Sequence, residues 1–356
     1  MSAFLTDTLV WTGALLAVVL LIRRPVAALF GAGAAYALWA LPMARLLLPP
    51  IVLPAWAAPA AEPVATDAIE VPLAAIGGVA PTTMAAPTPA IDWATILFTV
   101  WLAGAALFLV RRYALYFRMR RELLTDARPM GEAGRVRLVE TPAAEGPVAF
   151  GVIDKVIALP PGFMATQDRA SRDLALAHEL AHHRGHDLLC NMLVQPLFAL
   201  HWFNPLSTLG WRALRRDQEA ACDARVVARA PREARAAYAA VIARFAVQPQ
   251  RGARLALAAP MACPVLGDRS IVQRLKGLAM SEIPARRRWS GRLLLGAAVL
   301  ALPLTGSISY AQAAPEPPAP PAAPVPPEAP AAPKVSVVTV EKDGKKRTVH
   351  IERRIE

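Results

Sequence analysis

One long internal stretch of this sequence, residues 46–110, lacks positive charge and contains no Lys or Arg. Charged residues make up only 19% of the whole chain, whereas hydrophobic residues make up 55%. Soluble globular proteins carry about 25% charged residues, so this composition excludes an ordinary soluble protein. It indicates a membrane protein.

Cysteine is also scarce. The three cysteines, Cys190, Cys222 and Cys263, are far apart and form no CxxC pair. All three lie in the part of the chain that we expect in the cytosol, where thiols stay reduced. This argues against a disulfide framework, and we interpret Cys222 as a small buried residue rather than a metal ligand.

The positive charge that is present is unevenly placed. Residues 111–292 contain 29 Lys and Arg against 16 Asp and Glu, in a chain of net charge +12. Because cytoplasmic segments of membrane proteins are enriched in Lys and Arg, this asymmetry predicts that residues 111–290 face the cytoplasm. We expect this basic surface to lie against anionic lipid, and we expect no direct binding of nucleic acid.

Four apolar stretches are long enough to cross a bilayer, which takes about 20 helical residues. They cover roughly residues 3–22, 26–48, 93–110 and 291–311. We expect the pairs Arg23-Arg24 and Arg111-Arg112 on the cytoplasmic side of the inner membrane. The order of the four spans then places the N-terminus and the C-terminal tail outside. The predicted segments are two spans in 1–48, an external Ala/Pro-rich loop at 49–92, a third span at 93–110, a cytosolic domain at 111–290, a fourth span at 291–311 and an external Pro-rich spacer with a short tail at 312–356.

A further apolar run, residues 188–205, complicates this count of spans. Pro196 interrupts the run. We therefore predict a helix that packs inside the cytosolic domain or dips into the inner leaflet, rather than another crossing.

The C-terminal tail is short. Residues 335–340 and 348–351 have strand-like composition around Asp343-Gly344, which predicts a hairpin. Cleavage after Ala313 is an open alternative, because small residues there follow a basic flank and an apolar run, as in a signal peptide.

The most informative motif is His178-Glu179-Leu180-Ala181-His182. Residues four apart on a helix emerge on one face, so both imidazoles can hold a single metal ion. Glu179 then lies where a general base can take a proton from the attacking water. The motif predicts a peptidase that uses Zn²⁺.

Catalytic zinc usually has three protein ligands, so a third ligand is needed downstream. Glu219 and Asp223 lie four residues apart in a second helix-compatible run. We predict that Glu219 is the third ligand and that Asp223 accepts a hydrogen bond from the free ring nitrogen of a liganding histidine. His186 is a rival ligand, and His183 is expected at the polar surface.

Further motifs accompany these residues. They are His183-Arg184-Gly185-His186-Asp187, His201-Trp202-Phe203-Asn204-Pro205, Glu219-Ala220-Ala221-Cys222-Asp223, and upstream Pro147–Val152 with Val156–Pro160. Together with the HExxH motif they resemble the BlaR/MecR-type membrane metallopeptidases over roughly residues 1–310. The resemblance implies a mainly α membrane protein with four transmembrane helices and a cytosol-facing, gluzincin-like α+β domain, in which His178, His182 and Glu219 bind zinc and Glu179 is the base.

Two features concern the substrate. Phe150, Gly151 and Val152 fall in a predicted edge strand that could pair with an extended segment of a protein substrate. His201 is a candidate second donor to the oxyanion. Beta-lactam sensors of this type carry a penicillin-binding domain after the fourth span, whereas the residues after 311 contain no SxxK motif, so we expect no acylation by beta-lactams.

We therefore predict a membrane zinc endopeptidase that cleaves a cytosolic protein, by resemblance a transcriptional repressor, in signal transduction. Quality control of membrane proteins by the same chemistry is one alternative. A receptor or scaffold that signals through its tail without proteolysis is another, although it would have no use for an intact HExxH motif with Glu219. Residues 268–292 form either a juxtamembrane helix on anionic lipid or a site of self-cleavage, and the oligomeric state is left open.

Overall fold

The computed structural model describes residues 2–49, 51–54, 92–228, 230–247, 274–275, 277–278, 283–305, 308–310, 335–342 and 345–352. The chain divides into two compact units, Met1–Tyr310 and Ala311–Glu356. Most of the predicted external loop, the residues around Ala313, Cys263 and part of the stretch 268–292 lie outside the described residues.

The first unit begins with three helices, α1 (Ser2–Phe30), α2 (Ala32–Ala37) and α3 (Ala40–Leu47). The Arg23-Arg24 pair that separates the first two predicted spans lies inside a continuous helix, since α1 runs through Pro25 and ends before Gly31. Gly31 has a φ of 99°, which glycine adopts at low cost. The Arg23 guanidinium is buried in an ion pair with Asp217.

Two helices are long and apolar enough to cross a membrane among the described residues, Phe4–Phe30 within α1 and α4 (Trp93–Leu124). The stretch Ala32–Leu47 is a shorter apolar helix. The predicted fourth span coincides in part with α13 (Ala285–Ala301) and η3 (Leu302–Thr305), but α13 has only 17 residues and begins with a run of arginines. The layout with four spans therefore stays a prediction.

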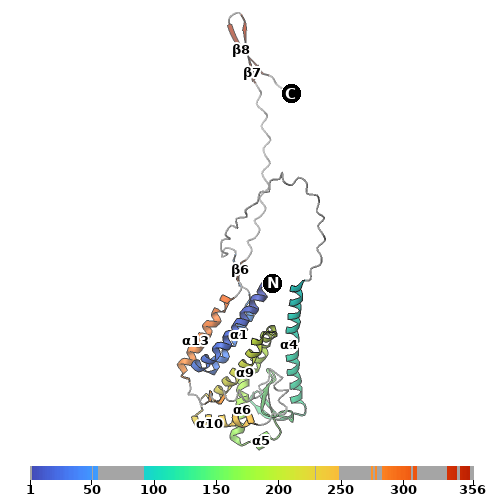
Figure 1. The fold of residues 1–356 in the computed structure, drawn as a ribbon, viewed down its shortest axis with the longest axis vertical. Helices are drawn as coiled ribbons and strands as arrows, with labels where there is room; N and C mark the ends of the chain where they lie inside the picture. Colours follow the sequence, from blue (N-terminus) through green and yellow to red (C-terminus); the bar gives the residue numbers. More distant parts are fainter. Residues whose placement is uncertain are drawn as a thin grey trace. The chain divides into compact units, whose positions relative to one another are not determined.

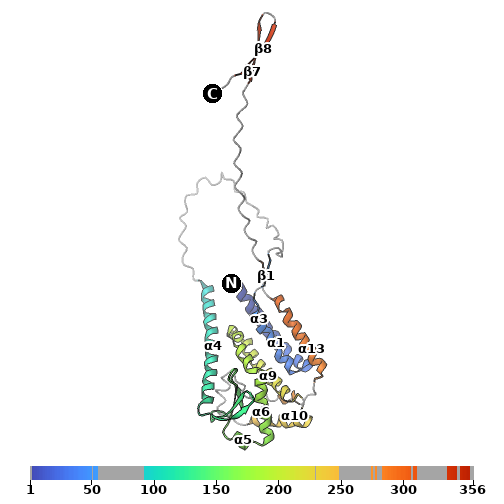
Figure 2. The same cartoon turned by 180° about the vertical axis from the view of Figure 1, so that it is seen from behind.

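Helices of the first unit pack side by side. Figures 1 and 2 show α1 between α13 and α9 (Pro205–Val226), with α4 on the other side of α9. An apolar core joins α1–α3 to the later helices, and Leu16, Trp39, Phe198 and Leu214 are among its buried members. Arg45 of α3 adds polar contacts, since it binds the Asp7 carboxylate and the carbonyl oxygen of Thr305.

Buried polar contacts also join the N-terminal helices to α9. Arg23 of α1 lies 2.5 Å from the Asp217 carboxylate, and the indole N–H of Trp39 donates to the same carboxylate at 2.9 Å. The amide of the next residue, Gln218, donates to the Tyr36 hydroxyl at 2.8 Å. Consecutive residues of α9 are thus held by side chains from α1, from α2 and from Trp39 at the start of α3.

The apolar run at 188–205 forms two short helices, α7 (Asp187–Leu193) and α8 (Gln195–Leu200). Pro196 lies in the first turn of α8, so the predicted interruption is confirmed. Leu197 and Phe198 are fully buried, which confirms that the run packs inside the fold. The indole N–H of Trp101 donates to the carbonyl of Leu200 at 2.9 Å and ties the end of α8 to α4.

A four-stranded sheet lies next to α4. Its strands are β2 (Arg128–Ala133), β3 (Val136–Glu140), β4 (Val148–Phe150) and β5 (Val156–Leu159), in the order β2-β3-β5-β4, with β3 and β5 parallel and the other pairs antiparallel. Side chains of β5 alternate between two cores, as strand geometry requires. Val156 and Ala158 pack with α4, whereas Ile157 and Leu159 pack with α5 (Phe163–Thr166) and α6 (Arg169–Arg184).

The predicted edge strand is shorter than expected. β4 does lie at an edge of the sheet, but it ends at Phe150, and Gly151 and Val152 belong to the turn into β5. The Phe150 side chain is fully buried in the core under α4, so it faces the protein interior rather than a bound peptide. Gly151 has a φ of 86°, and a Cβ there would overlap the carbonyl oxygen of Asp154.

We expect Gly151→Ala to destabilise the fold by about 1–3 kcal/mol, because it combines an unfavourable φ with a steric overlap. The measurement is the shift in Tm of the purified full-length chain in detergent. Gly134→Ala is the matched control, since Gly134 has a φ of 67° but open space around it. Equal Tm shifts for the two variants would contradict the overlap.

The remaining strands form two small ladders. β1 (Ile51–Leu53) pairs in parallel with β6 (Ile308–Tyr310). In the second unit, β7 (Val335–Lys342) pairs antiparallel with β8 (Lys345–Glu352), which confirms the predicted hairpin strands. The turn at Asp343-Gly344 lies outside the described residues.

Candidate metal centre

Helix α6 carries the HExxH motif. The Asp168 side chain accepts a hydrogen bond from the Ser171 N–H and caps the start of the helix. His178 and His182 lie one turn apart on a buried face, and their Nε2 atoms are 3.2 Å apart. The helix therefore directs both rings at one point.

Glu219 of α9 reaches the same point. Its Oε2 lies 3.4 Å from Nε2 of His178 and its Oε1 lies 3.6 Å from Nε2 of His182. The side chain is 1% exposed, and its Oε1 has no hydrogen-bond partner among the described residues. Ligands about 2.0–2.2 Å from a tetrahedral zinc ion are about 3.3–3.6 Å apart, so these three side chains fit a single ion.

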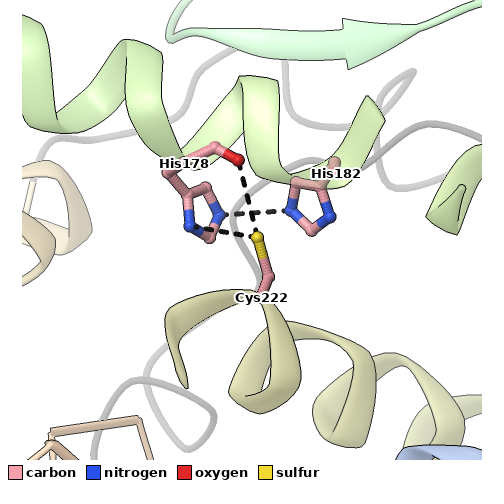
Figure 3. Close-up of side chains that lie close together, drawn as sticks. All are labelled: His178, His182 and Cys222. Carbon is pink, nitrogen blue, oxygen red and sulfur yellow. Dashed lines mark hydrogen bonds between the residues drawn. The ribbon is translucent and has the colours of Figure 1, made fainter. Parts of the chain in front are cut away.

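Cys222 lies on another side of the His178 ring. One ligand atom each from His178, His182 and Cys222 lie within 4.8 Å of one another, so they form a second possible ligand set. However, Figure 3 shows the Cys222 sulfur facing Nδ1 and the carbonyl oxygen of His178, at 3.6 and 3.5 Å. Because Nε2 is the atom that faces His182, geometry favours Glu219 over Cys222 as the third ligand.

The other ring nitrogen of His182 is held by Asp187, the first residue of α7. The Nδ1 atom lies 2.7 Å from the Asp187 carboxylate, which also binds Arg225. Such a carboxylate keeps the proton on Nδ1 and leaves Nε2 available for a metal. His186 turns the chain between these residues with a φ of 56°, and it belongs to no metal-binding group found among the described residues.

A longer relay holds His178. Its Nδ1 lies 2.8 Å from the hydroxyl of Tyr238 on α10 (Arg232–Val247), and that hydroxyl donates to Asp223 at 2.8 Å. Asp223 itself is 3.4 Å from Nδ1, so it supports His178 chiefly through Tyr238. Burial opposes ionisation of Asp223, but the Arg274 guanidinium outweighs burial and holds the pKa of Asp223 at about 2.

Glu179 is buried between α6 and the edge strand. Its Oε2 accepts a hydrogen bond of 2.7 Å from the backbone N–H of Ala149 in β4. Burial raises the pKa of the Glu179 carboxyl. A raised pKa suits a group that must take up and return a proton near neutral pH.

Two other histidines lie outside this cluster. His183 was expected at the polar surface, which is wrong, because its ring is buried and its Nε2 lies 3.2 Å from the carbonyl oxygen of Val156 in β5. Burial lowers the pKa of His183 to about 4. His201 has its Nε2 2.7 Å from the Thr12 hydroxyl of α1, so its described contact supports helix packing, and its role as an oxyanion donor stays a prediction.

The sequence matches the BlaR1 peptidase M56 family over residues 3–278. The chain belongs to this family. It is 29% identical over 176 residues to the regulatory protein BlaR1 of Bacillus licheniformis. The matched stretch covers 44% of this chain and 29% of that protein. It is 30% identical over 83 residues to the methicillin resistance protein MecR1 of Staphylococcus aureus, covering 23% of this chain and 14% of that protein. The chain thus matches less than a third of either relative, and the resemblance seen in the motifs is confirmed.

Proposed function

We propose that this BlaR1-type peptidase is a membrane-bound zinc endopeptidase whose ion is held by His178, His182 and Glu219. The observation that carries the proposal is the convergence of the two Nε2 atoms and the Glu219 carboxylate at 3.2–3.6 Å. A zinc ion bound there would supply a Lewis acid and an activated water for peptide hydrolysis.

The protein's own groups then have distinct roles. Glu179 takes the proton of the attacking water and returns it to the leaving amine. The Ala149 N–H holds one oxygen of Glu179, which restricts the rotation of the carboxylate. Because Ala149 lies in the edge strand β4, an extended peptide that adds to this edge would run beside Glu179. We therefore propose an extended segment of a protein as substrate.

The cellular setting is part of the same proposal. The basic residues of 111–290 favour a peptidase that faces the cytoplasm from the inner membrane. One relative, BlaR1, is a regulatory protein, which favours a role in signal transduction here, and the family resemblance suggests a cytosolic repressor as the substrate. A narrow set of cleavage sites in a mixture of cytosolic proteins would support this role, whereas broad cleavage of misfolded membrane proteins would support quality control.

Removal of zinc should abolish peptide hydrolysis, and stoichiometric zinc should restore it. The purified full-length chain is incubated in detergent with a peptide library before and after treatment with 1,10-phenanthroline. Cleavage is followed by mass spectrometry, and metal content is measured on the same samples. Unchanged cleavage by protein shown to be free of metal would overturn the proposed chemistry.

A further inference from the structure

Arg274 reaches the candidate metal centre from a part of the chain well beyond α10. Its Nε and Nη2 atoms each lie 2.7 Å from an oxygen of Asp223. Its Nη1 lies 3.5 Å from Oε2 of Glu219, and the residue is only 4% exposed. One guanidinium therefore contacts both the proposed third ligand and the carboxylate that supports His178.

Apolar contacts fix the segment that carries Arg274. Leu275 and Leu278 pack against a cluster formed by Val227, Tyr238 and Ile242 at the end of α9 and on α10. This cluster includes the tyrosine whose hydroxyl lies between Asp223 and His178. The position of Arg274 is thus set by packing as well as by charge.

The chemistry of this contact favours arginine. A guanidinium presents parallel N–H donors in a planar fork that matches both oxygens of a carboxylate, whereas a lysine ammonium does not. Asp223 and Glu219 are both almost fully buried, and a buried carboxylate that loses its cation is strongly destabilised. Loss of Arg274 would remove two charge-assisted hydrogen bonds from Asp223 and one nearby cation from Glu219.

We propose that Arg274 is a positioning residue of the metal site, orienting His178 through Asp223 and Tyr238 and orienting Glu219 directly. The inference rests on the proposed function, because it takes these side chains to be part of a zinc site. It adds that the site is completed by the segment that leads into α13, since Leu278 lies only seven positions before Ala285.

The test uses the full-length chain in detergent and measures zinc affinity by competition with a chromogenic chelator. We expect Arg274→Gln to weaken zinc binding about 10- to 100-fold, as is typical when a residue behind a metal ligand is lost. Arg274→Lys should recover only part of this loss, and the visible spectrum of the Co²⁺-substituted protein should change in both variants. Tyr238→Phe, which removes a single hydroxyl, should weaken binding in the same direction without a large change in Tm.

Two further variants separate positioning from general destabilisation. Asp223→Asn combined with Arg274→Gln should lose less zinc-binding free energy than the sum of the two single losses, because part of each loss comes from the contact that the two residues share. Arg120→Gln is the matched control, since Arg120 pairs with Asp154 in the same domain but away from the site. The zinc affinity of this variant should equal that of the wild type.

The outcomes are distinguishable. Wild-type zinc affinity and an unchanged Co²⁺ spectrum in Arg274→Gln, with only Tm lowered, would overturn the positioning role and leave the zinc peptidase standing. Weakened zinc binding in a chain that hydrolyses no peptide would support the role of Arg274 while the proposed function fails. A wild-type chain that binds no zinc at all would overturn both.

Discussion

Glu179→Gln is expected to lower the rate of peptide hydrolysis by about 10³-fold while bound zinc stays at the wild-type level. Glutamine has nearly the same shape, and its carbonyl oxygen can still accept the hydrogen bond from the Ala149 N–H. What it cannot do is take a proton from water. The measurement is the hydrolysis rate of a cleaved library peptide, together with metal content.

A matched control exists in the same domain. Glu140 also accepts a hydrogen bond from a backbone N–H, that of Gly162 at 3.0 Å. Glu140→Gln therefore repeats the change in charge and shape at a distance from the motif, and it should keep full activity. Comparable rates for the two variants would rule out Glu179 as the general base.

Glu219→Gln is expected to weaken zinc binding more than about 100-fold, whereas Cys222→Ser should leave it close to the wild-type value. The expectation follows from the site geometry, in which Glu219 faces Nε2 of both histidines and Cys222 faces Nδ1 of one. Losing a direct ligand should cost more than losing a residue behind it, for which about 10- to 100-fold is typical.

The two variants decide between the possible ligand sets. Zinc affinity is measured by chelator competition, and each variant is compared with the wild type at the same pH. The reverse pattern, with zinc lost in Cys222→Ser and kept in Glu219→Gln, would assign the metal to His178, His182 and Cys222. Equal losses would mean that both residues bind the ion.

The parts of the site that sequence reasoning found are those fixed by helical periodicity. A separation of four residues brings His178 and His182 onto one face of α6, and the same spacing relates Glu219 and Asp223 on α9. The hairpin of β7 and β8 was equally visible, because its strands are short, local and flank a turn sequence. Local geometry is sufficient to relate the residues within each element, whereas the approach of Glu219 to the two histidines depends on the packing of α9 against α6.

The residues that were missed depend on contacts between distant segments. Tyr238 lies 60 positions from His178, and Arg274 lies 51 positions from Asp223, so no spacing rule connects them. Asp187 reaches His182 only because the chain turns at His186, after α6 has ended. His183 points about 100° away from His182, as expected, but the sheet covers that side of α6 and buries it.

The contacts of Asp217 and Gln218 bear on whether the peptidase domain can be separated from the N-terminal helices and keep its structure. A chain that began at residue 111 would match the composition boundary in the sequence, yet it would take Arg23 and Trp39 away from Asp217 and Tyr36 away from Gln218. Those two residues immediately precede Glu219 on the same helix. Excising the catalytic part from its N-terminal helices would therefore loosen the backbone next to the proposed zinc ligand, so biochemical work on this protein has to keep those helices.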